Sequence, residues 1–333
     1  MSIADVAEIP ARETVTNRVA VVDVARGVAL VAMTIYHLAW DLSFFGHVDP
    51  DVLRQPAWIV FARTIASSFL FLVGVGLVLG HGREFGRAFR PRPFLVRLGQ
   101  IAAGAAAISV ATYFFVPGGF IFFGILHAIA LFSVLVLPFL AWPWWAAAGA
   151  GVVVLVVGNT VALEAFDAAP LVWLGLAANP PISNDFVPVF PFLAPVLFGV
   201  AAAKVMTREA WRQLARLPLA GTSWLTFIGR HSLLYYLAHQ PILFGLLGAA
   251  AWAGVQPDPA VRAEVFRKAW VSECVQRADR SFCEPYAACM IGAVQREGLL
   301  DAVAANALDA RQRQRLDGLI DGCVVEAGAA SGR

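Results

Sequence analysis

Five polar residues share one face of the first apolar segment of the chain. They lie within residues 20–41, a run that is apolar and long enough to cross a bilayer. At about 100° per residue, they fall within an arc of roughly 80° on one face of a helix. A charge near the centre of a bilayer costs roughly 2.5–3.5 kcal/mol, so this stripe needs a physical reason. The five residues are Asp23, Arg26, Thr34, His37 and Asp41.

The stripe has two interpretations. One is helix packing, with an ion pair between Asp23 and Arg26 and a satisfied His37 inside a bundle. The other is a polar chamber within the membrane in which chemistry or transport takes place. His37 and Asp41 are four residues apart and therefore neighbours on a helix. A carboxylate that fixes the tautomer of a histidine and raises its basicity is the usual arrangement for general-base catalysis.

Two further histidines lie in later apolar segments. His127 lies roughly 10 Å from one end of the segment 120–141. His239 lies in the segment 231–254, beside Gln240 and just before Pro241. Each histidine alone is typical of a satisfied core residue, but three of them together with a carboxylate favour a functional site.

The elements that must position these side chains are membrane-spanning helices. The chain has 333 residues, of which 59% are hydrophobic and 14% charged, whereas a soluble protein is about one quarter charged. The sequence therefore predicts an all-α fold, a polytopic membrane bundle of about seven transmembrane helices. The expected spans are 20–41, 57–80, 95–116, 120–141, 144–163, 186–206 and 231–254.

Charge asymmetry between the connections predicts the topology. The connections 81–97 and 204–230 each carry five basic residues against one acidic residue. The connection 164–185 has three acidic residues and no Lys or Arg. The positive-inside rule places the basic connections in the cytoplasm. We therefore predict a multi-pass protein of the inner (plasma) membrane, with a cytoplasmic N-terminus, a polar N-terminal segment 1–17 that is not a removable signal peptide, and an extracytoplasmic C-terminus.

The cysteines give independent support for this orientation. All four follow the last span, and an even number in a short polar segment fits two disulfides in an oxidising compartment, with three pairings open. A reduced cytoplasmic tail or a metal site is the alternative, but the spacings lack the paired form of a zinc ribbon, so we predict no metal. The expected domains are a membrane domain 18–254 and a small, helical, disulfide-stapled module 257–333. The cysteines are Cys274, Cys283, Cys289 and Cys323.

Several motifs in 18–250 resemble one family, the bacterial relatives of heparan-alpha-glucosaminide N-acetyltransferase. The tail with the cysteines lies outside this resemblance. The motifs are Asp23-x-x-Arg26-Gly27, Met33 with His37, Asp41-Leu42-Ser43-Phe44-Phe45-Gly46, Phe123-Gly124-Ile125-Leu126-His127, Asn184-Asp185-Phe186-Val187-Pro188-Val189-Phe190-Pro191, and Gly229-Arg230-His231-Ser232 continuing through Leu233-Leu234-Tyr235-Tyr236-Leu237-Ala238-His239-Gln240-Pro241.

The resemblance implies a transmembrane acyltransferase that takes an acetyl group from cytosolic acetyl-CoA and delivers it to an acceptor on the far side. The lysosomal members acetylate the amine of a terminal glucosamine. They are similar to this chain at Asp23, Arg26, Gly27 and His239, but look to carry an asparagine at the position of His37. Their active histidine lies just past the first span, where the nearest candidate here is His47.

The implied reaction assigns a role to each polar group. The phosphates of the donor would seek basic residues on the cytoplasmic side, although such arginines are equally typical of topology and lipid headgroups. A rise of 1.5 Å per residue separates Arg26 from His37 by about 16 Å, the order of an extended pantetheine arm. His37 would act as general base or nucleophile, and His127 and His239 would donate to the oxyanion. The expected donor-binding residues are Asp23, Arg26, Arg83, Arg87 and Arg230, and the expected catalytic residues are His37, Asp41, His127, His239 and His47.

The expected partners are the lipid bilayer and an extracytoplasmic sugar or glycan with an amine or hydroxyl, and no nucleic acid. A homo-oligomer stays open. A proton-coupled transporter or permease is the competing function, because buried histidines and carboxylates also form proton relays. The chain shows no clear internal repeat of the kind that transporters often contain. The tail also permits, without requiring, a scaffold or sensor that binds an envelope partner.

Overall fold

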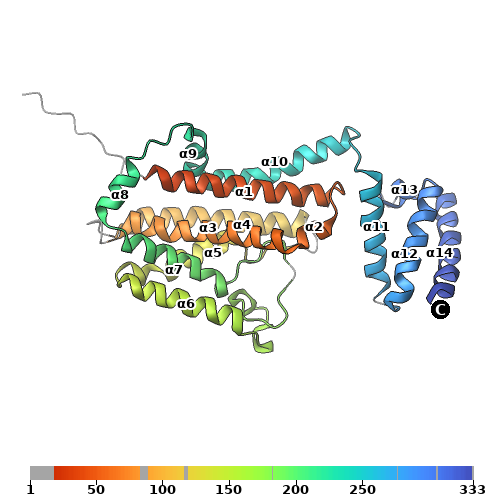
Figure 1. Ribbon diagram of the computed structural model, residues 1–333, viewed down its shortest axis with the longest axis horizontal. Coiled ribbons are helices and arrows are strands. Elements are labelled where there is room, and N and C mark those ends of the chain that lie inside the picture. The colour runs from red at the N-terminus through yellow and green to blue at the C-terminus, as the bar shows by residue number, and fades with distance from the viewer. Residues whose placement is uncertain are drawn as a thin grey trace, which may run out of the picture. The chain divides into compact units, whose positions relative to one another are not determined.

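The computed structural model describes residues 19–82, 89–115, 119–181, 183–275, 277–304 and 307–331. Over these ranges the protein is helical, apart from an isolated bridge between Leu163 and Ala177, so the predicted all-α class is confirmed (Figure 1). The helices are α1 (Ala20–Phe44), α2 (Pro50–Arg54), α3 (Pro56–His81), α4 (Pro91–Phe115), α5 (Ile125–Leu135), η2 (Leu137–Leu140), α6 (Trp144–Thr160), η3 (Glu164–Phe166), η4 (Val172–Leu174), α7 (Val189–Val205), α8 (Arg208–Ala215), α9 (Ser223–Arg230), α10 (Ser232–Trp252), α11 (Pro259–Cys274), α12 (Arg280–Arg296), α13 (Leu300–Ala304) and α14 (Ala310–Ser331).

Each of the seven predicted spans contains a helix, but the number of spans is not confirmed. In the described ranges, α1, α3, α4 and α10 are long and apolar enough to cross a membrane. The pair α7 and α8, bent by 99°, would add a fifth span. Helices α5 and α6 are apolar but short, and the 17 residues of α6 extend only about 26 Å, less than a typical hydrocarbon core.

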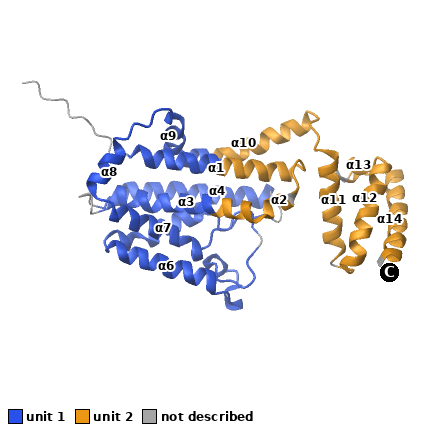
Figure 2. Ribbon diagram, in the orientation of Figure 1, with its two compact units in different colours: residues 1–32, 64–237 blue, residues 33–63, 238–333 orange. Residues whose placement is uncertain are grey.

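The described structure divides into two compact units, which cut across the order of the sequence (Figure 2). Unit 1 comprises residues 1–32 and 64–237, and unit 2 comprises residues 33–63 and 238–333. Helices α1 and α10 therefore contribute residues to both units. The predicted boundary between a membrane domain and a tail near residue 256 stays a prediction.

The core of unit 1 depends on close backbone contact between α3 and α7. A Cβ atom added at Gly74 of α3 would fall on the carbonyl oxygen of Val196 in α7. Reciprocally, a Cβ atom at Gly199 of α7 would fall on the carbonyl oxygen of Phe71. Small residues permit such contacts between membrane helices, where tight packing drives association. Around this contact, apolar side chains of α3, α5, α6 and α7 form one continuous core.

Unit 2 contains a small bundle of α11, α12, α13 and α14, in which α12 packs against both α11 and α14 (Figure 1). Asp309 is the N-cap of α14: its carboxylate accepts from the backbone N–H of Gln312, and the side-chain oxygen of Gln312 accepts in return from the backbone N–H of Asp309. Gly298, with a φ of 64°, follows the end of α12, where a left-handed residue commonly terminates a helix.

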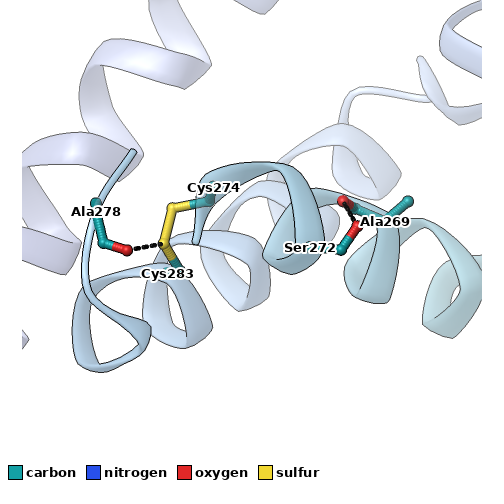
Figure 3. Close-up of a disulfide and its surroundings, with 5 residues drawn as sticks. All are labelled: Ala269, Ser272, Cys274, Ala278 and Cys283. Atoms are coloured by element: carbon teal, nitrogen blue, oxygen red, sulfur yellow. Dashed lines mark hydrogen bonds between the residues drawn. A yellow bond between two sulfur atoms is a disulfide. The ribbon is translucent and has the colours of Figure 1, made fainter. Parts of the chain in front are cut away.

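Two disulfides hold this bundle together, which confirms the predicted number and decides their pairing. Cys274 at the end of α11 bonds to Cys283 in the first turn of α12 (Figure 3). Cys289 of α12 bonds to Cys323 of α14. The two bridges therefore join α12 to each of its two neighbours.

An ion-pair cluster joins the bundle to the loop that follows α1. The ammonium group of Lys268 in α11 lies 2.6 Å from Asp49 and 2.5 Å from Asp51. Asp49 also caps α2, because its carboxylate accepts from the backbone N–H of Asp51 at 3.0 Å. The hydrogen bond from Lys268 lowers the pKa of Asp49 below its usual value of 3.8, and the hydrogen bonds that Lys268 donates to Asp49 and Asp51 raise the pKa of Lys268. This cluster links α11 of the bundle to the start of α2.

Replacing Lys268 with methionine is expected to lower thermal stability in a pH-dependent way. A carboxylate with a lowered pKa stabilises the fold above its unfolded pKa and loses that contribution as pH falls through the folded one. The gap in melting temperature between wild type and Lys268→Met should therefore be full between about pH 5 and 10 and close below about pH 4. The control Arg280→Met removes an exposed ion pair with Glu284 and should change the melting temperature little at any pH. A gap that does not narrow in acid contradicts the assigned ion pairs.

Removing the longer-range disulfide is expected to destabilise the bundle more than removing the other. The sequence separations are 34 residues for Cys289–Cys323 and 9 for Cys274–Cys283. In the chain-entropy account, this difference is worth about 1 kcal/mol. The test is to replace both cysteines of one disulfide with serine in the full-length protein, once for each disulfide. The stability of each variant is then compared through the protease sensitivity of α11–α14 at increasing denaturant concentration. Equal sensitivity of the two variants would exclude this entropic ordering.

Candidate functional site

Unit 1 contains an open cavity of about 530 Å³ with basic groups on its wall. Its polar lining includes Arg26 of α1, His81 of α3, Arg97 of α4 and Arg230 of α9. Apolar side chains such as Phe94 and Leu126 form the rest of the surface. Among the described residues that line the cavity there is no carboxylate. The cavity therefore favours an anion, and guanidinium groups match the oxygens of phosphates especially well.

A buried carboxylate forms ion pairs with two of these arginines. Asp23 is only 1% exposed. Its Oδ1 lies 3.3 Å from Nη1 of Arg26, and its Oδ2 lies 3.6 Å from Nε of Arg230. Arg26 also donates to the carbonyl of Leu72 in α3 at 3.5 Å. Because one carboxylate is shared by two guanidinium groups, the pair of arginines keeps a net positive charge toward the cavity.

Two glycines allow α9 to approach α1 closely enough for this arrangement. A Cβ atom at Gly229 would fall on the carbonyl oxygen of Asp23, and one at Gly27 on the carbonyl oxygen of Leu225. Both contacts are backbone to backbone and cannot be relieved by moving a side chain. The position of Arg230 beside Asp23 therefore depends on the absence of a side chain at Gly229.

The structure brings together three of the five predicted donor-binding residues, Asp23, Arg26 and Arg230. Arg83 and Arg87 lie outside the described residues. Sequence reasoning counted Arg97 only among the five basic residues of the connection 81–97 and did not single out His81. Their positions could have indicated both residues. His81 is the last residue of α3 and Arg97 lies in the second turn of α4, so they lie at the two ends of the basic connection.

Unit 2 holds a second group of polar side chains, from α1 and α10. The rings of His37 and His239 lie edge to face, with centroids 5.1 Å apart. Asp41 is fully buried, and His239 is 8% exposed. The chain of α10 thus places a second imidazole beside His37, which the sequence could not establish across about 200 residues.

Asp41 pairs with Gln240 rather than with His37. The side-chain Nε2 of Gln240 donates to Oδ1 of Asp41 at 2.6 Å. The other carboxylate oxygen, Oδ2, is buried and has no hydrogen-bond partner in the part of the chain that the structure describes. The expected pairing of Asp41 with His37, one turn away, is therefore not formed. The spacing of one helical turn places the two side chains on one face of α1, but the hydrogen bond to the carboxylate comes from Gln240 of α10.

His127 belongs to unit 1, where both of its ring nitrogens are engaged at the start of α5. Nδ1 accepts from the backbone N–H of Gly124 at 3.2 Å, and Nε2 lies 3.2 Å from the hydroxyl of Ser109. Asp185 completes this helix cap by accepting from the backbone N–H of Ile125 at 2.8 Å. These contacts describe a ring that orders the N-terminus of α5, and a catalytic role for His127 stays a prediction.

His47 lies in unit 2, in the turn between α1 and α2. Its backbone N–H donates to the carbonyl of Leu42 at 2.7 Å. The preceding residue, Gly46, has a φ of 78°, and a Cβ atom added to it would lie 3.5 Å from the ring of Pro257, just before the C-terminal bundle. The role of His47 as the active histidine stays a prediction. Within the described ranges, no group of three or more His, Cys, Asp or Glu residues could hold a metal ion.

Adding one methyl group at Gly229 is expected to separate α9 from α1 and displace Arg230. Overpacking against backbone costs about 1–3 kcal/mol. The matched control is Gly99→Ala, in α4, where nothing lies within 4 Å of an added Cβ atom and helix propensity favours alanine by up to about 1 kcal/mol. Thermal unfolding of the purified protein should rank Gly229→Ala below wild type and Gly99→Ala at or above it. A Gly229→Ala variant as stable as wild type contradicts the close contact.

Comparison with known proteins identifies the family of the chain. A family model described as heparan-alpha-glucosaminide N-acetyltransferase, catalytic, matches residues 18–241. No curated protein and no solved structure gives a significant match to the chain. The matched range includes the arginine-lined cavity and the paired His37 and His239 of unit 2, and it ends before the disulfide-bonded bundle. The protein therefore belongs to the family of the heparan-alpha-glucosaminide N-acetyltransferase catalytic domain, which indicates a membrane acetyltransferase.

Proposed function

We propose that the protein transfers an acetyl group from cytosolic acetyl-CoA to an amine or hydroxyl of an extracytoplasmic sugar or glycan. The observation that carries this proposal is the cavity lined by Arg26, Arg97 and Arg230, without a carboxylate among its described lining residues. Coenzyme A is a polyanion with a diphosphate, and arginine clusters bind such groups through paired, charge-assisted hydrogen bonds. Its apolar pantetheine arm is also suited to the apolar part of the wall.

His37 is the proposed general base. It would take the proton of the acceptor while the acceptor nitrogen or oxygen attacks the carbonyl carbon of the thioester. The carbon–sulfur bond then breaks, the new C–N or C–O bond remains, and the proton goes to the departing thiolate to give free coenzyme A. His239, whose ring lies against that of His37, is the neighbouring group proposed to stabilise the oxyanion.

The proposed orientation follows from charge and from the disulfides. Seven spans with basic connections inside would place the N-terminus and the arginine-lined cavity on the cytoplasmic side, where acetyl-CoA is found. The two disulfides of the C-terminal bundle support an oxidising, extracytoplasmic location for it. The acceptor would approach from that side, past Asp41 and His47, toward His37. This arrangement makes α1 the element that serves both substrates.

Replacing His37 with alanine is expected to abolish acetyl transfer while leaving donor binding intact. General-base catalysis contributes roughly 10²–10⁴-fold. We would measure thiol release from acetyl-CoA by the purified protein in detergent, with glucosamine and with crude envelope glycan as acceptors. Thermal stabilisation by coenzyme A reports binding separately. Arg97→Ala should show the opposite pattern, with weakened stabilisation and a raised KM for acetyl-CoA.

The control for these variants is Arg54→Ala, which removes an exposed arginine of α2 that pairs with the exposed Asp51 at 3.5 Å. It should match wild type in both assays. Full activity in His37→Ala would reject His37 as the base. Folded wild-type protein that neither binds coenzyme A nor releases thiol with any acceptor would reject the enzyme and favour a transporter, to be tested by solute flux in vesicles.

A further inference from the structure

Asp41 is a buried carboxylate with half of its hydrogen-bonding capacity unused. The side chain is fully buried, yet Oδ2 has no partner among the described residues. A buried carboxylate normally requires donors at both oxygens, since an unmet polar atom in a low-dielectric interior is costly. Asp23, on the same helix, meets this requirement with two arginines. The described residues therefore leave Oδ2 of Asp41 open to a donor such as an incoming ligand.

Gln240 of α10 also has a buried side-chain oxygen without a hydrogen-bond partner among the described residues. Its Nε2 donates to Oδ1 of Asp41 at 2.6 Å, which fixes the orientation of the amide, because the alternative would set two oxygens against each other. That orientation turns Oε1 away from the carboxylate, and this oxygen is also buried and has no partner in the described chain. Two unmet acceptor atoms thus belong to one hydrogen-bonded pair between α1 and α10, the same two helices that carry the paired rings of His37 and His239.

We propose that Gln240 is a positioning residue of the acceptor site. Its amide N–H holds the carboxylate of Asp41, so that Oδ2 of Asp41 and Oε1 of Gln240 together receive donor hydrogens of the incoming acceptor. The shared chemistry is a group that donates two hydrogen bonds, either a primary amine or a pair of neighbouring sugar hydroxyls. This inference rests on the proposed function and extends it to a residue and a recognition mode.

Gln240 acts through Asp41 and through contact with the acceptor, and takes no part in donor binding. The arginine-lined cavity belongs to unit 1, whereas Asp41, Gln240 and both rings belong to unit 2. A change at Gln240 should therefore raise the KM for the acceptor or lower kcat, and leave the KM for acetyl-CoA unaltered. A purely structural role in packing α10 would alter both together.

The test compares two substitutions of similar size with a control on the same helix. Gln240→Met keeps the volume but removes the donor and the acceptor, and it should raise the acceptor KM or lower kcat by about tenfold or more, the order expected for an unmet buried charge. Its KM for acetyl-CoA should stay within twofold of wild type. The control Leu246→Met, at an exposed position of α10, should match wild type throughout. Glucosamine and a sugar without an amine serve as the two acceptors, and loss on one alone identifies the group that is recognised.

Gln240→Glu gives a signature that packing would not produce. A glutamate can donate to Asp41 only while the two carboxyl groups share a proton, and that proton is lost as pH rises. The activity of Gln240→Glu relative to wild type should therefore fall as pH increases. This ratio decides the question alone if Gln240→Met does not fold.

Two results would overturn the inference while leaving the proposed function in place. One is an active wild type with acceptor constants unaltered in Gln240→Met. The other is a Gln240→Glu to wild-type ratio that does not change with pH. A wild-type protein that binds no coenzyme A and transfers no acetyl group removes the proposed function first, and the role of Gln240 falls with it.

Discussion

A carboxylate removed from water must find its hydrogen-bond donors within the protein, and α1 carries two such groups. Asp23 is met by Arg26 and Arg230, which leaves it satisfied and surplus positive charge on the cavity wall. Asp41 is met by one amide of Gln240 and stays half satisfied. The same requirement thus has two results on α1. At Asp23 it leaves positive charge on the cavity wall, and at Asp41 it leaves a carboxylate oxygen that can accept a hydrogen bond. Both features suit the two substrates of an acetyl transfer.

Close contact between helix backbones is what brings these groups within reach. Membrane helices gain little from hydrophobic association, since lipid tails are as apolar as leucine, so small residues at their contacts matter more. Gly74 and Gly199 allow α3 to lie against α7, and Gly27 and Gly229 allow α9 to lie against α1. The second contact carries Arg230 to Asp23. The electrostatics of the cavity therefore depend on residues that have no side chain at all.

The C-terminal bundle is held by covalent bonds and charge rather than by a large core. Its two disulfides link α12 to both neighbours, and Lys268 binds the carboxylates that flank the start of α2. A small module commonly needs such bonds, because little apolar area is available to bury. The turn between α1 and α2 contains His47 and ends at Asp49. Because Lys268 binds Asp49, the bundle restrains the segment past which the proposed acceptor would approach.

The sequence by itself determined the helical class, the polar stripe on α1, the membership of an acetyltransferase family and the presence of two disulfides. These follow from local pattern: hydrophobic runs, spacing along one helix, and the number and placement of cysteines. It did not determine how many helices span the membrane, because α5 and α6 match the expected apolar segments in composition but are too short to count by length. Only the tertiary structure decided which cysteines pair, that Gln240 and not His37 meets Asp41, and that His81 and Arg97 join Arg26 and Arg230 around one cavity. Each of these is a choice among partners distant in the chain, and it is made by helix packing and burial, which spacing along the sequence does not encode.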